Sequence, residues 1–273
     1  LWADPGSIYI WLALSATLVS AAVGFWDDYL KIVKGHRKGM LAKDKLAVQI
    51  VVGLAIGILF YFYPPLAEVR TSTEIPFIKN VVVDFGIFYI VWIAFVITGS
   101  TNAINLTDGL DGLAVGLSGI VAAVFTITAY VVGRIDFSQY LNLTYLPGAG
   151  ELAIFAASVG GAALGFLWFN AHPAEVFMGD TGALSLGAAF GTTAILLKKE
   201  FLLLIVGGIF VIETLSVIIQ VASFQTTGKR VFKMTPIHHH FELLGWPESR
   251  VVIRFWIAGV MCALMGLATF KIR

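Results

Sequence analysis

The 273-residue chain is far more apolar than a soluble protein of its size. Hydrophobic residues make up 58% of it and charged residues 13%, with a mean hydropathy of +0.88, whereas soluble domains average roughly 45–50% and about 25%. A single core of this length cannot enclose so much apolar surface, so part of that surface must face lipid. The net charge of +1 argues against nucleic-acid binding. A single cysteine, Cys262, excludes an internal disulfide framework and a cysteine-cluster metal site.

Eight apolar segments are each about long enough to cross a bilayer as a helix, which needs about 20 mainly apolar residues. They are continuously apolar rather than alternating, which favours helices over the strands of a closed barrel. We therefore predict an all-α, polytopic integral membrane protein with one domain over residues 1–273. Gly207, Gly208 and Glu213 interrupt the seventh segment and predict a kink or break. The segments are Ser7–Trp26, Leu46–Tyr63, Gly86–Asn105, Leu113–Val132, Leu152–Asn170, Thr181–Leu197, Phe201–Phe224 and Val251–Phe270.

The connecting segments form two sets, which lie on opposite sides of the membrane if all eight segments cross it. The first set carries 11 of the 18 lysine and arginine residues, counting Arg254, so the positive-inside rule places it in the cytoplasm. The polar motifs that could carry chemistry all lie in this set. It comprises residues 27–45, 105–112, 171–180 and 222–250, and the other set comprises 64–85, 133–151, 198–200 and both termini.

Adjacent carboxylates, Asp27 and Asp28, end the first apolar segment. Anions at a helix C-terminus oppose the helix dipole, which makes two incidental solvated acids the weaker interpretation. Such a pair can bind a divalent cation, or one member can take up a proton. The basic residues that follow either hold phosphate groups or only set the topology; they are Lys31, Lys34, Arg37, Lys38, Lys43 and Lys45.

A polar segment, 105–112, reads NLTDGLDG and precedes the fourth apolar segment. Its glycines let backbone N–H groups approach a ligand at a helix N-terminus, and Asp108 and Asp111 project to one side; a capped turn is the alternative. Further along, VFMGD at 176–180 ends on Asp180. That aspartate is either a helix N-cap or part of a site where an aromatic ring stacks on a base and an acid holds a cation.

A histidine string, PIHHHFE, occupies residues 236–242. Adjacent histidines cannot all face one ion in a regular helix or strand, so contact with phosphate or sugar is favoured over a zinc site. Glu213 and Gln220 lie at membrane depth, where ionisable groups usually face an interior or a cavity. We assign Glu213 no chemistry.

Together, the acid pair, the segments 105–113 and 176–180 and the histidine string resemble the phospho-N-acetylmuramoyl-pentapeptide transferase family. That family is a branch of the polyprenyl-phosphate N-acetylhexosamine-1-phosphate transferase superfamily, and the histidine string is similar to this branch specifically. The family typically has ten spans, so we expect this chain to lack the first two. The resemblance implies a homodimer in the bacterial cytoplasmic membrane with its active site on the cytoplasmic side.

The resemblance also implies a reaction. Phospho-MurNAc-pentapeptide is transferred from UDP-MurNAc-pentapeptide to undecaprenyl phosphate within the lipid bilayer, which yields lipid I and UMP in peptidoglycan biosynthesis. Oxygen ligands without thiols point to Mg²⁺ as the cofactor. The alternatives are a related transferase that uses UDP-GlcNAc, which the histidine string disfavours, and an ion-coupled transporter, whose site would lie near the midplane.

Residue roles follow from the same resemblance. The catalytic residues would be Asp27 as the base that deprotonates the lipid phosphate, Asp28 as its support and Asp180 as the metal ligand. A rival mechanism, in which an aspartate attacks the donor first, stays open. Phe177 would stack on uracil, and Asp111 would accept its imide N–H. The other implied substrate-binding residues are Lys31, Lys43, Asn105, Asp108, Gly109, Leu110, Asn170, His238, His239 and His240.

Overall fold

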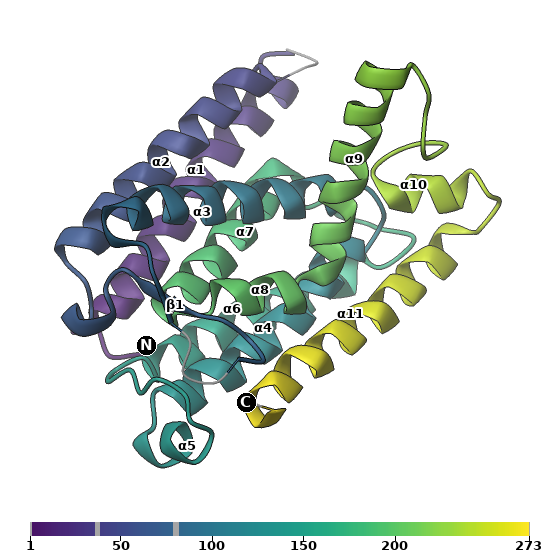
Figure 1. Ribbon diagram of the computed structural model, residues 1–273. Coiled ribbons are helices and arrows are strands. Elements are labelled where there is room, and N and C mark those ends of the chain that lie inside the picture. The colour runs from purple at the N-terminus through teal and green to yellow at the C-terminus, as the bar shows by residue number, and fades with distance from the viewer. Residues whose placement is uncertain (1, 36–38, 79–81, 273) are drawn as a thin grey trace.

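The computed structural model describes residues 2–35, 39–78 and 82–272, and it is a bundle of long helices (Figure 1). Arg37 and Lys38 lie outside the described residues. Seven helices of the described chain are long and apolar enough to cross a membrane, which confirms an all-α polytopic membrane protein. They are α1 (Ile8–Ile32), α2 (Ala42–Phe62), α3 (Tyr89–Thr107), α4 (Leu113–Val132), α6 (Glu151–Asn170), α9 (Gly208–Thr227) and α11 (Glu248–Ile272).

The remaining elements are short, apart from one central helix. A two-stranded antiparallel hairpin pairs Ser72 with Asp84 in the connection 64–85, where no strand was predicted. The central helix is α7 (Gly179–Leu196). The short elements are η1 (Ala67–Val69), β1 (Ser72–Glu74), β2 (Val82–Asp84), η2 (Gly86–Phe88), α5 (Ile135–Tyr140), α8 (Glu200–Val206) and α10 (Ile237–Glu242).

Helix α7 matches the predicted segment 181–197 but is not among these seven helices, because it is less apolar than they are. It lies in the centre of the bundle, and 13 of its 18 residues are buried. A helix enclosed by protein needs small residues for close packing more than it needs an apolar outer surface. It still runs from one end of the bundle to the other, since Asp180 meets α1 and Lys198 meets Arg70.

The predicted break in the seventh apolar segment is confirmed. Helix α8 ends at Val206, and α9 begins at Gly208 after the single residue Gly207. The first apolar segment was predicted to end at Trp26, whereas α1 continues to Ile32. The acid pair therefore lies in the last turns of α1 rather than in a loop.

The two sets of connecting segments lie at opposite ends of the bundle, one set at each end. At one end, the backbone N–H of Thr144 donates to Glu74 (3.0 Å) and that of Asp4 donates to Glu151 (2.7 Å). These contacts join the hairpin, the connection 133–151 and the N-terminal residues. The polar motifs meet at the other end, as the site below describes.

Close helix packing brings α1 and α3 directly against α7. A Cβ at Gly24 of α1 would lie 2.3 Å from the backbone oxygen of Asp180, and one at Gly187 of α7 would lie 2.4 Å from the Cα of Thr101. Only glycine permits such approaches between helix backbones. The packing fixes the ends of α1 and α7 relative to each other, and the candidate site lies where those ends meet.

Candidate active site

Three carboxylates from two antiparallel helices form the centre of the site. Asp27 and Asp28 lie near the C-terminus of α1, and Asp180 lies in the first turn of α7, with one oxygen of each within 4.8 Å of the others. Because α7 begins where α1 ends, the acids face the positive end of the α7 dipole. The position that looked unfavourable for anions on α1 alone is therefore favourable in the folded bundle.

Asp28 holds the N-terminus of α7 in place. Its two oxygens accept hydrogen bonds from the backbone N–H groups of Asp180 (3.2 Å) and Thr181 (2.9 Å), and from the Thr181 hydroxyl (2.7 Å). These are free N–H groups of a first helical turn. Gly179 has a φ of 65°, and a Cβ there would lie 2.9 Å from an Asp28 oxygen. Asp28 thus orients Asp180 by capping its helix from outside.

Two lysines neutralise the carboxylates. Lys31 Nζ lies 2.6 Å from Asp27 and 3.9 Å from Asp28, and it also bonds to Asp180. Lys45 Nζ, from the first turns of α2, lies 3.0 Å from Asp180 and 3.8 Å from Asp27. Because both lysines pair with the acids, they offset the electrostatic repulsion among the three carboxylates.

Lys45 was missing from the predicted site residues, whereas Lys43 was among them. In the structure Lys43 is exposed in the first turn of α2, and within the described part of the chain it makes none of the ion pairs that Lys45 makes. The sequence placed both in one basic run. Only the direction in which α2 leaves the loop distinguishes them.

Asn105 and Asp108 complete the polar end of α3. The Asn105 side-chain amide donates to Asp180, and Asp108 is the C-cap residue of α3. Burial, together with the charges of Asp180 and Asp28, raises the pKa of Asp108 to about 6. This carboxyl therefore changes its charge close to neutral pH.

The donor set fits a hard divalent cation. Asp27, Asp28 and Asp180 offer only carboxylate oxygens, which suit Mg²⁺. Lys31 and Lys45 already place positive charge among these oxygens. A cation would take over part of the neutralisation that the ammonium groups provide.

A second group of residues joins the loop 171–178 to the polar segment 105–112. Asn170 accepts from the Gly112 N–H (3.1 Å) and donates to the Val176 carbonyl (2.8 Å). The side chain of Asp111 accepts from the Ala174 N–H (3.0 Å). These bonds put Asp111 and Leu110 in the same neighbourhood as the loop of Phe177, whose ring is 76% exposed and open to stacking.

Two partners of Asp111 were not predicted. His172 Nδ1 lies 3.3 Å from an Asp111 oxygen and 3.5 Å from Glu248, and Glu248 also accepts from the Asp111 N–H (2.7 Å). Glu248 begins α11, more than 130 positions from Asp111 in the chain. No spacing rule within the sequence connects residues so far apart.

The three histidines have different surroundings. His238 is fully buried, and its Nδ1 lies 3.1 Å from Glu213. His239 pairs with Glu242 (2.7 Å). His240 Nδ1 accepts from the Lys233 N–H (3.1 Å). The string therefore does not present three equivalent rings.

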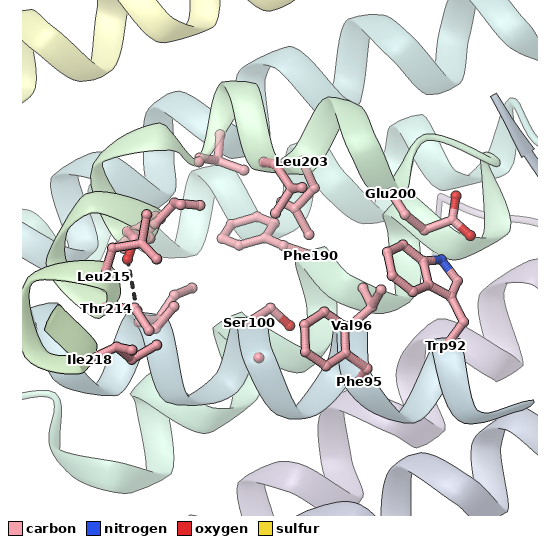
Figure 2. A pocket seen from close by; sticks show the side chains of 18 residues that line it. Trp92, Phe95, Val96, Ser100, Phe190, Glu200, Leu203, Thr214, Leu215 and Ile218 are labelled. Carbon is pink, nitrogen blue, oxygen red and sulfur yellow. Dashed lines mark hydrogen bonds between the residues drawn. The ribbon is translucent and has the colours of Figure 1, made fainter. Parts of the chain in front are cut away.

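An apolar cavity of about 240 Å³ is lined mainly by α3, α8 and α9 (Figure 2). Figure 2 shows Phe95, Val96 and Ser100 of α3 facing Phe190 and Leu203 across it. It extends along α3 as far as Ile104, which precedes the Asn105 that bonds to Asp180. One end of this cavity therefore reaches the helical turn of α3 that carries Asn105.

The sequence pattern of the family described as Glycosyl transferase family 4 matches residues 10–198, more than half of the chain. The chain belongs to glycosyl transferase family 4. The match makes it a polyprenyl-phosphate sugar-phosphate transferase. It includes the three carboxylates, both lysines and the segment 105–112, whereas α8 to α11 and the histidine string lie beyond it.

Proposed function

We propose that this transferase moves phospho-MurNAc-pentapeptide from UDP-MurNAc-pentapeptide to undecaprenyl phosphate, which yields lipid I and UMP. The observation that carries the proposal is the carboxylate and lysine cluster, with an apolar cavity that extends along α3 to Ile104, one residue before the Asn105 that bonds to Asp180. A lipid phosphate needs both features together, an apolar surface for its chain and a polar end where its phosphate meets a charged donor. The histidine string supports the muramoyl donor over other sugar nucleotides.

The acceptor's chain occupies the groove between α3 and α9. Its lining is almost wholly apolar, with side chains such as Phe95, Phe190 and Leu215. A prenyl chain in this groove would cover apolar side chains that membrane lipid would otherwise cover. A chain lying in the groove brings its phosphate towards Asn105 and Asp180. The site then lies at the cytoplasmic face, where the donor arrives from the cytosol.

Asp27 is the base of this reaction. It is 2% exposed, and one oxygen accepts from the Met40 N–H (2.5 Å) while the other faces Lys31 and Lys45. Asp27 takes the proton of the lipid phosphate, whose oxygen attacks the phosphorus that carries the sugar, and UMP leaves. Lys31, with a side chain 37% exposed, can turn its ammonium towards the donor phosphates.

Mg²⁺ held by Asp180 supplies charge neutralisation for the pyrophosphate when bound. Asp28 keeps α7 and therefore Asp180 in position. The nucleotide lies along the second group of residues, with Phe177 stacked on uracil and Asp111 accepting its imide N–H. Direct attack is favoured over an aspartyl intermediate because an ionised phosphate oxygen is already a competent nucleophile.

One experiment tests the donor and the mechanism together. Purified protein is incubated with undecaprenyl phosphate and either UDP-MurNAc-pentapeptide or UDP-GlcNAc, and UMP and the lipid product are followed. We expect turnover with the muramoyl donor and no UMP burst without the acceptor. Turnover with UDP-GlcNAc but not with UDP-MurNAc-pentapeptide would favour the related transferase. A stoichiometric UMP burst from donor without undecaprenyl phosphate would favour the covalent route.

A further inference from the structure

Glu248, the first residue of α11, holds a segment of the site that is far from it in the chain. Its Oε1 accepts a hydrogen bond from the backbone N–H of Asp111 (2.7 Å), and its Oε2 lies 3.5 Å from His172 Nδ1. The matched family pattern ends at residue 198, so Glu248 lies outside it. The reaction described above does not use this carboxylate.

The bond from Glu248 fixes the main chain of Asp111. Glu248 lies in the first turn of α11, where the positive end of the helix dipole favours an anion. A hydrogen bond from an amide to a charged oxygen is shorter and stronger than one between neutral groups. The end of the segment 105–112 is therefore tied to α11 by a single side chain.

The Asp111 carboxylate uses only one of its oxygens within the fold. Its Oδ2 accepts from the Ala174 N–H (3.0 Å) and lies 3.3 Å from His172 Nδ1. Its Oδ1 makes no hydrogen bond to any residue that the structure describes, and the side chain is 21% exposed. Oδ2 thus anchors the carboxylate to the loop 171–178, and Oδ1 is left to accept a hydrogen bond from a ligand.

We propose that Glu248 is a positioning residue for nucleobase selection, which fixes Asp111 so that Oδ1 accepts the imide N–H of uracil. This inference rests on the proposed function, because it takes the uracil of the donor to lie at Asp111. Uracil carries a proton on the ring nitrogen between its carbonyl groups, whereas cytosine carries none there. A fixed acceptor rejects cytosine because the acceptor is then left without its proton donor.

The test measures calorimetric binding of UMP and CMP to the purified protein and compares the ratio of their Kd values, CMP over UMP. We expect wild type to prefer UMP at least about tenfold, since CMP lacks one hydrogen bond to a charged group. The melting temperature of each protein is measured alongside.

Two substitutions at Glu248 separate reach from charge. Glu248→Asp keeps the charge but shortens the side chain, so its oxygen no longer reaches the Asp111 N–H. The ratio should fall at least about threefold, through a higher Kd for UMP. Glu248→Gln loses the charge but keeps an acceptor oxygen at the same reach, and its ratio should stay within about twofold of wild type.

Glu151→Asp is the matched control. Glu151 likewise begins a helix, α6, and accepts from a backbone N–H of a distant segment, that of Asp4 (2.7 Å), at the opposite end of the bundle. Its substitution should change the melting temperature and leave the ratio at the wild-type value. An unchanged ratio in Glu248→Asp, or an equal fall in Glu151→Asp, would overturn the inference.

The wild-type results distinguish this inference from the reaction on which it rests. Wild type that prefers UMP but transfers no phospho-MurNAc-pentapeptide would refute the proposed reaction alone, and the variants would still decide the role of Glu248. Wild type that binds UMP and CMP equally would overturn the placement of uracil at Asp111, and this inference with it, while the measured transfer would still support the reaction.

Discussion

Asp108 is the titratable residue whose charge depends most directly on the assembled site. Its pKa is raised from 3.8 to about 6 by burial and by Asp180 and Asp28. The folded protein therefore holds this proton more tightly than the unfolded chain, and the free energy of unfolding falls as the pH rises from about 4 through 6. The folded structure therefore favours the protonated, neutral carboxyl of Asp108.

The substitution Asp108→Asn removes this titration. In EDTA, we expect the variant to melt at a higher temperature than wild type at pH 7.5 and at the same temperature near pH 4. Thermal unfolding in detergent across this pH range measures the difference. A wild type that is more stable than the variant at pH 7.5 would show that Asp108 is stabilised as an anion.

The sequence motifs predicted the centre of the site and left out its supports. Asp27, Asp28 and Asp180 are brought together as expected. Lys45, His172 and Glu248 were not predicted, because each enters the site through the packing of α2, the loop 171–178 or α11 rather than through a local spacing. The capping role of Asp28 was likewise invisible before α7 was placed beside α1.

At the scale of helices, the contact between α1 and α7 controls the geometry of the cluster. Gly24→Ala places a methyl group where the backbone of α7 lies, so we expect a lower melting temperature and at least a tenfold loss of transfer, in line with the steep dependence of rate on alignment. Gly161→Ala in α6 is the control, because nothing lies within 4 Å of its Cβ position. The control should be neutral or slightly stabilising; equal effects of the two would argue against a special contact at Gly24.

The groove makes a separate prediction for the acceptor. Gly99 lines the cavity, and a Cβ there would meet nothing within 4 Å, so we expect Gly99→Trp to fill the groove while its Cβ leaves the backbone packing unchanged. We expect KM for undecaprenyl phosphate to rise at least about fivefold and donor KM to stay the same. Gly165→Trp on α6, also free of neighbours, controls for bulk at the lipid surface. An unchanged acceptor KM for Gly99→Trp would exclude this groove as the chain's path.

Helix positions followed well from hydropathy, and the exceptions have physical causes. The predicted break at Gly207 was found, and α7 occupies the predicted segment 181–197 but is less apolar than the other long helices, because protein encloses it. Hydropathy measures what a helix offers to lipid, and α7 offers little. The hairpin of β1 and β2 was missed because three-residue strands carry too short a pattern to detect.

For the whole molecule, the two ends of the bundle should lie on opposite sides of the membrane. Lys34 and Gln139 are exposed at opposite ends, and single cysteines there, in a Cys262→Ser background, should label from opposite sides of sealed vesicles. The orientation follows from the charge of the loops, so the Lys34 position should be the cytoplasmic one. Labelling of both from one side would contradict the arrangement of the bundle across the membrane.

The cluster around Asp180 is proposed to carry out metal-dependent transfer to a lipid phosphate. The most direct test measures UMP release by wild type and by Asp180→Asn, with UDP-MurNAc-pentapeptide, with and without undecaprenyl phosphate, over a Mg²⁺ titration. We predict that wild type releases UMP only when acceptor and Mg²⁺ are both present, and that Asp180→Asn releases none at any Mg²⁺ concentration. Near-normal release by Asp180→Asn with an unchanged Mg²⁺ requirement would show that Asp180 is not the metal ligand of the transfer.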